Sequence, residues 1–259
     1  MNLLSIAGFD PSAGAGVLLD LNVFRALGFD GAAVLTAITV QNTAAVFRIR
    51  ALDPRFVRAQ AEALVRDMAF SGLKVGMIGS SANLREVGRL LNNHAHLPRV
   101  IDPVLCSSSG RRLIESSAVD RFLKTVEKMA SVLTPNLDEA ARLAGRQVRT
   151  IADMHAAAEI IFERTHVPCL IKGGHLAGDA VNLLFDGRTE TRFRKRRWAK
   201  DVHGTGCLFS SALLAFLVQS GDLAEAGRLA TDWTHRAIRT ARPIGKGRAV
   251  FSARFLPPA

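Results

Sequence analysis

The amino-acid sequence predicts an α/β protein in which helices cover both faces of a mostly parallel sheet with an antiparallel edge. Short apolar segments of strand length alternate with longer segments of helical periodicity over most of the 259 residues, which is typical of a parallel sheet. Near the end of this alternation, Asp186-Gly187 separates two strand-like segments, as in an antiparallel hairpin. No linker or repeat interrupts the pattern, so we expect a single domain over residues 1–259.

The predicted strands are short and apolar, and glycine or proline follows several of them. Gly8 ends the first strand, while Pro103 and Pro135 end the fourth and fifth, because proline cannot donate to a strand ladder. The second strand, AAVLTAITV, is rich in β-branched residues. In chain order the predicted strands are residues 3–7, 32–40, 73–78, 99–102, 131–134, 169–172, 181–185 and 189–198.

The predicted helices carry apolar residues three or four positions apart. Gly28 closes the first helix, and Pro54 precedes the second, which has Val57, Ala61 and Leu64 on one face. In chain order the predicted helices are residues 14–27, 55–68, 83–91, 118–129, 153–162, 205–218 and 223–239.

Composition limits the class of protein. A chain with 48% hydrophobic and 22% charged residues folds into a globular core rather than staying disordered. It has three cysteines and no CxxC pair, which disfavours a disulfide scaffold or a structural zinc site and favours a reducing compartment. No apolar stretch is long enough to span a bilayer, and the first residues do not resemble a signal peptide. We therefore expect a cytoplasmic protein without membrane segments.

The net charge of +11 predicts anionic partners, which include phosphorylated ligands and nucleic acid. The basic excess is concentrated in residues 192–200, where Phe193 and Trp198 are interleaved. Such a segment can contact nucleic acid, but its alternation is also typical of a half-solvated strand. Because charge runs are usually solvated faces, we treat nucleic-acid binding as the weaker interpretation.

Polar and glycine-rich residues follow the predicted strands, and the carboxyl ends of parallel strands share one edge of a sheet. Ligands of open α/β sheets bind in the crevice beyond that edge. The sequence therefore predicts one crevice. The residues expected around it are Gly8, Phe9, Asp10, Gln41, Asn42, Met77, Asp102, Pro103, Pro135, Asn136, Lys172, Gly173 and Gly174.

The sequence His203-Gly204-Thr205-Gly206-Cys207 stands directly before a long apolar helix. Two glycines allow a sharp turn, so that several backbone N–H groups at the helix N-terminus can bind a phosphate or stabilise a transferring phosphoryl group. The same helix end is expected to lower the pKa of the Cys207 thiol. The alternative interpretation is a glycine turn that leads into a cysteine packed in the core.

Three further strand ends each allow a chemical and a purely structural interpretation. Asn136 and Glu139 can hold a hydrated Mg²⁺ from one helix face, but N-x-x-E at a helix start is more often a capping box. Lys172, before two glycines, can reach a phosphate or stay solvated. Asp102, before a proline, can act in a site or form an Asx turn.

Two common nucleotide-binding patterns are missing from the sequence. Gly14-Ala15-Gly16 lacks the third glycine of a dinucleotide fingerprint, because position 19 is Leu, and no G-x-x-x-x-G-K-[ST] sequence occurs. These absences disfavour a Rossmann dehydrogenase and a P-loop NTPase.

Seven motifs, read in order, resemble those of the hydroxymethylpyrimidine/phosphomethylpyrimidine kinases of thiamine biosynthesis, within the ribokinase-like superfamily. Each is weak alone, but the set spans most of the chain. The motifs are SIAGFDPSAGAG (5–16) with Asp20, TAITVQNT (36–43), KVGMIGS (74–80), IDPV (101–104), LTPNLDEA (133–140), IKGGH (171–175) and HGTGC (203–207). Ala13 departs from the pattern, because glycine is usual at that position.

The resemblance implies a three-layer α/β/α ribokinase-like fold, usually dimeric, that uses MgATP to phosphorylate the 5-hydroxymethyl group of an aminopyrimidine and then the resulting monophosphate. It also implies roles for individual residues. The implied roles are recognition of the aminopyrimidine edge by Gln41, with Gly8, Asp20, Met77 and Val104 lining that pocket; magnesium binding by Asp102 and Glu139; contact with ATP phosphates by Lys172 and Asn136; an anion hole formed by Gly204, Thr205 and Gly206; and a catalytic base, Cys207.

Two other functions remain open at this stage. A pyridoxal/pyridoxine kinase of the same superfamily is one, although such relatives tend to lose the glutamine found here at position 41. A non-catalytic, basic kinase-like binding protein is the other, and the joint presence of Asp102, Glu139, Lys172 and Cys207 disfavours it.

Overall fold

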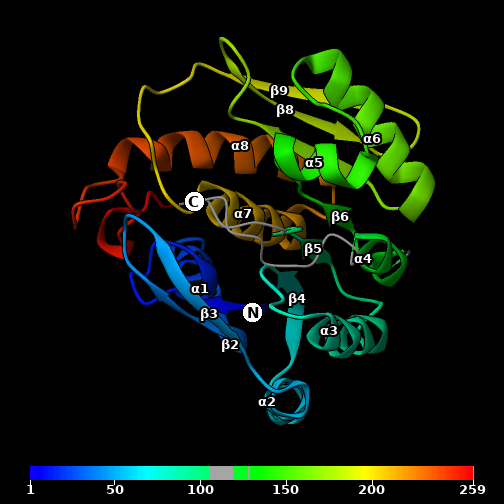
Figure 1. Ribbon diagram of the computed structural model, residues 1–259, viewed down its shortest axis with the longest axis vertical. Coiled ribbons are helices and arrows are strands. Elements are labelled where there is room, and N and C mark those ends of the chain that lie inside the picture. The colour runs from blue at the N-terminus through cyan, green and yellow to red at the C-terminus, as the bar shows by residue number, and fades with distance from the viewer. Residues whose placement is uncertain (105–118, 128, 259) are drawn as a thin grey trace.

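The computed structural model describes residues 1–104, 119–127 and 129–258, which form one nine-stranded sheet between two helical layers (Figure 1). The strand order is β3-β2-β1-β4-β5-β6-β7-β8-β9. The strands are β1 (Asn2–Phe9), β2 (Asp30–Gln41), β3 (Val46–Ala51), β4 (Phe70–Val75), β5 (Arg99–Ile101), β6 (Val132–Leu133), β7 (Cys169–Gly173), β8 (Ala180–Phe185) and β9 (Glu190–Lys195).

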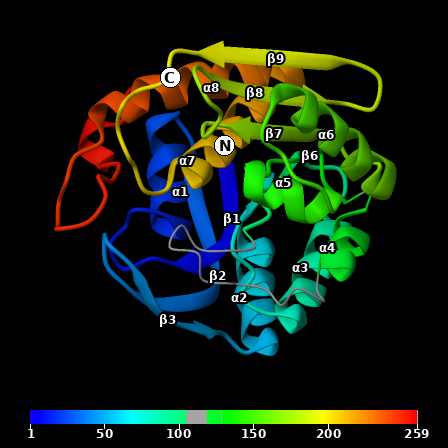
Figure 2. The same ribbon diagram turned by 45° about the horizontal axis from the view of Figure 1, so that its top comes forward.

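Six central strands, in the order β2-β1-β4-β5-β6-β7, run parallel to one another. At the two ends of the sheet, β3 pairs antiparallel with β2, β8 with β7, and β9 with β8. Figure 2 shows β3 and β9 at opposite ends of the sheet. The mostly parallel sheet and its antiparallel hairpin edge are thus confirmed. The second antiparallel edge, β3, was not predicted, although its sequence VFRIRA alternates between apolar and basic residues from Phe47 to Ala51. The strand predicted over 73–78 ends at Val75, so Met77 lies in the loop beyond it.

The helices occupy two layers, which the two hydrophobic cores define. Helices α1, α7 and α8 pack on one face of the sheet, and α2 to α6 pack on the other (Figure 1). This arrangement confirms the three-layer α/β/α fold. The helices are α1 (Gly16–Ala26), α2 (Pro54–Asp67), α3 (Ser81–Asn93), α4 (Val119–Val126), α5 (Leu137–Ala144), α6 (Ile151–Thr165), α7 (Thr205–Ser220) and α8 (Leu223–Thr240). Residues 118 and 128 of the helix predicted over 118–129 lie outside the described residues.

Helix α7 is apolar all round because other elements cover every side of it. Its residues from Leu208 to Leu217 are buried without interruption, and it packs against α1, α8 and the strands β4 and β5. A helix that is hydrophobic on all faces belongs in the middle of a layer. This position brings the N-terminus of α7 to the carboxyl ends of the central strands.

A buried ion pair joins four elements beneath the start of α7. The Lys74 ammonium on β4 lies 2.9 Å from both carboxylate oxygens of Asp20 on α1. Ser5 on β1 and Ser211 on α7 donate to the same carboxylate at 2.6 and 2.8 Å. All four residues have 0% exposure, so removing one charge would leave the other unpaired at a cost of about 3–5 kcal/mol.

The loop between β1 and α1 contains two residues with positive φ. Gly16 has φ +60°, and a Cβ there would lie 2.2 Å from the Gly8 carbonyl oxygen, so only glycine fits. Ala13 has φ +55°, a conformation that costs an L-residue about 1–2 kcal/mol. Glycine is usual at this position in the kinases that the sequence resembles, and the backbone keeps the conformation that glycine favours.

We expect Ala13→Gly to stabilise the protein. Relief of the left-handed strain exceeds the roughly 0.5–1 kcal/mol that glycine loses through its more flexible unfolded chain, which leaves a net gain of about 0.5–1 kcal/mol in the free energy of unfolding. Urea denaturation of both proteins measures this difference. Ala15→Gly is the control, because Ala15 has an extended backbone at φ −153° and its replacement should destabilise. A loss of stability in Ala13→Gly would contradict the expectation.

Candidate active site

The carboxyl ends of β5 and β7 meet the first turn of α7. The Lys172 ammonium lies 2.6 Å from Asp102 Oδ1, and the side chains of both are largely buried. A Cβ at Gly206 would lie 3.1 Å from Lys172 Nζ and 3.7 Å from Asp102 Oδ2. The glycine therefore lets the helix backbone come close to this ion pair. An anion bound by the α7 N-terminus would lie beside the Lys172 charge.

Asn136 and Glu139 form a capping box at the start of α5. Asn136 Oδ1 accepts a hydrogen bond from the Glu139 backbone N–H at 2.9 Å, and Glu139 Oε2 accepts one from the Asn136 N–H at 2.8 Å. The capping interpretation is thus confirmed. Burial raises the pKa of the Glu139 carboxyl to about 8; the Lys172 ammonium opposes this rise and the Asp102 carboxylate adds to it. The capping residue therefore also lies in the electrostatic field of the strand-end pair.

Helix α7 begins at a glycine turn that leaves its first N–H groups without a side-chain cap. Gly204 is the N-cap, with φ +82°, and it supplies no side-chain hydrogen bond. A Cβ at Gly204 would lie 1.8 Å from the Gly14 carbonyl oxygen, so only glycine allows this approach. The backbone N–H groups of Thr205, Gly206 and Cys207 belong to the first turn and are suited to bind an anion.

Cys207 lies at this helix end, but its thiol is less acidic than we expected. Burial raises the pKa of the Cys207 thiol to about 11, with Asp20 and Asp102 adding to the rise and Lys74 opposing it. The expectation of a lowered pKa is therefore wrong, because desolvation outweighs the helix terminus. The backbone N–H of Gly16 also hydrogen-bonds the sulfur and favours the thiolate.

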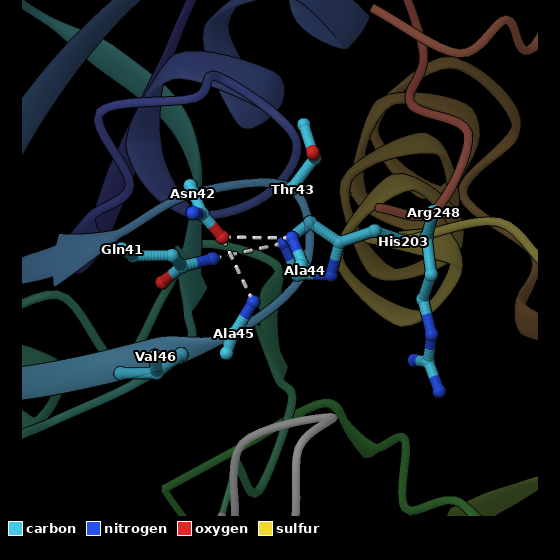
Figure 3. Close-up of a pocket in the computed structure, with 8 residues that line it drawn as sticks. All are labelled: Gln41, Asn42, Thr43, Ala44, Ala45, Val46, His203 and Arg248. Carbon is cyan, nitrogen blue, oxygen red and sulfur yellow. Dashed lines mark hydrogen bonds between the residues drawn. The ribbon is translucent and has the colours of Figure 1, made fainter. Parts of the chain in front are cut away.

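A shallow pocket opens beside Gln41, between the tip of the β2–β3 hairpin and the start of α7 (Figure 3). Gln41 and His203 face each other across it, with their Nε2 atoms 3.1 Å apart. His203 Nε2 lies 3.0 Å from Asp10 Oδ2 as well. The lining residues are Gln41, Asn42, Thr43, Ala44, Ala45, Val46, His203 and Arg248.

The other residues expected around the pyrimidine occupy three different environments. A Cβ at Gly8 would lie 3.0 Å from the Met77 sulfur, so these two residues are in contact. The Val104 N–H bonds the Asp102 carbonyl oxygen at 2.8 Å, which places Val104 next to the strand-end pair. Asp20 is enclosed by its partners and has no exposed surface.

Several residues of the site were not identified from the sequence. Lys74 lies within the KVGMIGS motif, and its position in the middle of a buried strand was the available signal. Asp10 was expected at the crevice and His203 lies within a quoted motif, but nothing in the sequence pairs two residues 193 positions apart. Asn42 was expected at the crevice, whereas Arg248 and the hairpin residues 44–46 carried no chemical signal.

Two broader properties concern only the described part of the chain. Among residues 1–104, 119–127 and 129–258, no group of three or more His, Cys, Asp or Glu is arranged to hold a metal ion. Asp102 and Glu139 are thus a pair of carboxyls and not a complete metal cage. Within the same ranges, none of the helices has both the length and the apolar character needed to cross a bilayer.

Comparison with solved structures identifies relatives of this fold. Pyridoxal kinase from Staphylococcus aureus in complex with pyridoxal has a TM-score of 0.89 and 28% identity, and the match covers 97% of this chain and 93% of that chain. Other structures of the Staphylococcus kinase contain AMP-PCP or ADP. Phosphomethylpyrimidine kinase from Clostridium difficile has a TM-score of 0.79 and 33% identity, with 92% of this chain and 99% of that chain covered.

Comparison of sequences gives a more specific result. The model of the phosphomethylpyrimidine kinase family matches residues 10–252. The hydroxymethylpyrimidine/phosphomethylpyrimidine kinase of Aquifex aeolicus is 36% identical over 249 residues, which are 95% of this chain and 98% of the relative. These matches include the loop before α1, the strand ends and the glycine turn before α7. The chain therefore belongs to the phosphomethylpyrimidine kinase family.

Proposed function

We propose that this protein transfers the γ-phosphoryl group of ATP to the 5-hydroxymethyl group of 4-amino-5-hydroxymethyl-2-methylpyrimidine, and then phosphorylates the monophosphate, in thiamine biosynthesis or salvage. The observation that carries this proposal is the convergence of Lys172, Asp102 and the uncapped start of α7. Phosphoryl transfer depends mainly on positioning and on neutralising negative charge. An ammonium group and a set of backbone N–H groups within one small region supply both.

The phosphate end of the site uses residues from three elements. Lys172 and Asn136 contact the phosphates of ATP, and their backbones are paired by a β-bridge. The N–H groups of Thr205, Gly206 and Cys207 form the anion hole for the transferring group. Asp102 and Glu139 offer the oxygen ligands that Mg²⁺ prefers, so this pair suits the magnesium ion that accompanies ATP once the Glu139 carboxyl, whose pKa is raised to about 8, is ionised.

Cys207 takes the proton of the substrate hydroxyl. As the new O–P bond forms and the bond to ADP breaks, the hydroxyl proton moves to the Cys207 sulfur. This step needs the thiolate, which the Lys74 ammonium and the Gly16 N–H both favour. A thiol with a pKa of about 11 is mostly protonated at neutral pH, so only a small fraction of free protein is in the active form.

The pyrimidine end of the site is centred on Gln41, whose planar amide can both donate to and accept from an aminopyrimidine edge. Gly8 and Met77, which are in contact, form one wall, and Val104 borders the strand-end pair. Asp20 acts from below this pocket, since its carboxylate is already occupied by Lys74 and two serines. Its role is to hold the elements that line the pocket.

The structure offers little support for a basic nucleic-acid binder. Five of the six basic side chains in residues 192–200 have partners within the fold. Arg192 pairs with Glu190, Arg194 with Asp179 and Lys195 with Asp232, and the side chains of Arg197 and Lys200 donate to backbone carbonyls. Basic side chains that are paired with carboxylates attract the phosphates of a nucleic acid less strongly than unpaired ones do. Pyridoxal phosphorylation stays the principal alternative, because the Staphylococcus kinase shares the fold over nearly the whole chain.

We further propose that the protein acts as a homodimer through the β2–β3 edge. Ile38 and Val40 lie on one face of β2 and are 41% and 58% exposed. Exposed apolar residues on an edge hairpin favour pairing with a second copy. Because Gln41 directly follows Val40 at the end of β2, such an interface would hold the β2–β3 hairpin, and with it Gln41, in place.

The first test is a panel of substrates. We expect ADP release from MgATP with hydroxymethylpyrimidine, two successive additions of phosphate by mass spectrometry, and much weaker turnover of pyridoxal. The reason is that the Gln41 amide matches the donor and acceptor of an aminopyrimidine. Turnover of pyridoxal without turnover of the pyrimidine would reverse the substrate assignment.

The second test concerns the base. Cys207→Ala should lower kcat by about 10²–10⁴-fold while calorimetry still detects substrate binding. Because the deprotonated thiol is the active form and its pKa is about 11, kcat/KM of the wild type should rise with pH through the range of about 7–10. Cys169→Ala is the matched control, since it removes a buried thiol from β7 and should keep this profile. An unchanged kcat in Cys207→Ala would show that the base lies elsewhere.

The third test concerns the dimer. Sedimentation velocity should give the mass of two chains for the wild type and of one chain for Val40→Lys, because a charge on the edge face opposes pairing. Arg188→Ala, in the hairpin turn at the opposite end of the sheet, should remain dimeric. A monomeric wild type at micromolar concentration would exclude the proposed assembly.

A further inference from the structure

The carboxamide of Gln41 is held at both ends by protein groups. As placed, Gln41 Nε2 lies 3.1 Å from His203 Nε2 and Gln41 Oε1 lies 3.2 Å from Thr39 Oγ1 (Figure 3 shows the His203 side). The oxygen and nitrogen of an amide have nearly the same shape, so their hydrogen-bond partners decide which end is which. The direction in which Gln41 presents its donor and acceptor therefore depends on His203 and Thr39.

At the first end, Asp10 determines what His203 can do. Asp10 Oδ2 lies 3.0 Å from the same His203 Nε2 atom. Burial opposes ionisation of Asp10, but hydrogen bonds from His203 and Ser12 outweigh it and hold its pKa below the usual value. A carboxylate only accepts, so Nε2 must carry a proton and donate it. A protonated nitrogen cannot accept from an amide N–H, and Gln41 must turn its oxygen toward His203.

At the second end, a backbone carbonyl makes the same choice independently. Thr39 Oγ1 lies 3.0 Å from the Phe9 carbonyl oxygen, which can only accept. The single hydroxyl proton of Thr39 is used there, so its lone pairs face Gln41 and accept from the amide nitrogen. Both ends therefore favour one orientation of the Gln41 carboxamide, with oxygen toward His203 and nitrogen toward Thr39. This orientation exchanges the oxygen and nitrogen relative to their placement above, which leaves the shape of the amide unchanged.

We propose that the Asp10–His203 pair is a positioning device that sets the polarity of the Gln41 carboxamide and so selects a 4-aminopyrimidine over its 4-oxo analogue. This inference rests on the proposed contact between Gln41 and the substrate. The amide oxygen keeps a second lone pair for the exocyclic amine, and the amide nitrogen keeps a second proton for the ring nitrogen. In a 4-oxo ring the exocyclic group is an acceptor and the ring nitrogen carries a proton. Its oxygen therefore meets the Gln41 oxygen and its N–H meets the Gln41 N–H, and neither pair can form a hydrogen bond.

Asp10→Asn tests the pair with little change in shape. The carboxamide that replaces the Asp10 carboxylate can donate to His203 Nε2, which lets that nitrogen accept and lets Gln41 turn over. We expect KM for the aminopyrimidine to rise about 10–100-fold, as for an unmatched buried polar pair, with little change in kcat. The preference for the 4-amino over the 4-oxo ring should fall by a similar factor.

Ser12→Ala is the matched control, because Ser12 donates to the other oxygen of the same carboxylate, Asp10 Oδ1. This variant loses the hydroxyl bond to Asp10 but leaves the acceptor facing His203 unchanged, so its preference between the two rings should equal that of the wild type. If Ser12→Ala loses the preference for the 4-amino ring as fully as Asp10→Asn does, the effect comes from a loosened loop around Asp10. In that case amide polarity does not explain it, and the proposal is overturned.

Two measurements separate this inference from the proposed function. If Gln41→Ala leaves KM for the pyrimidine unchanged, the substrate contact itself is wrong. If Gln41→Ala raises KM while Asp10→Asn keeps the ring preference, the function stands and the polarity device fails. Nitrogen-15 NMR of the folded wild type tests the proposal without any variant, because it reports whether His203 Nε2 carries a proton. We expect a protonated Nε2, and an unprotonated Nε2 would overturn the proposal.

Discussion

The close approach of two glycine-containing loops is the constraint on which this site depends. The Gly204 turn passes so near the Gly14 carbonyl that a Cβ at Gly204 would lie 1.8 Å from it. This contact places the start of α7 against the loop that follows β1, and it brings His203 to Asp10 and the Cys207 sulfur to the Gly16 N–H. One steric junction thus joins the pyrimidine end of the site to the phosphate end.

Two buried ammonium–carboxylate pairs flank that junction, and they explain why the reactivity of Cys207 differs from the sequence-based expectation. Lys74–Asp20 lies beneath the helix start, and Lys172–Asp102 lies at the strand ends. A helix terminus contributes about 0.3–1 kcal/mol to a charged group, which is less than the cost of burying a thiolate beside two carboxylates. The Lys74 ammonium is therefore the main group that favours the thiolate.

The capping box at α5 holds the two side chains for which we propose a chemical role. Glu139 uses Oε2 to cap the Asn136 N–H, and its carboxyl is still close enough to Lys172 and Asp102 for their charges to shift its pKa. The helix cap fixes the side chain, and fixed side chains are what phosphoryl transfer needs. The capping interpretation of this motif is confirmed, and the magnesium interpretation, which we propose, is compatible with the same geometry.

The sequence by itself determined most of the order of strands and helices, the polar residues that follow the strands, and the family, because periodicity and motifs are local properties. Edge strand β3 was missed, although Phe47 to Ala51 alternate between apolar and basic residues as a strand does. Only the tertiary structure decided that Asp20 pairs with Lys74 and that Gln41, His203 and Asp10 form one network. Partners 54 to 193 positions apart meet through the packing of whole elements, and burial created by that packing sets the thiol's pKa.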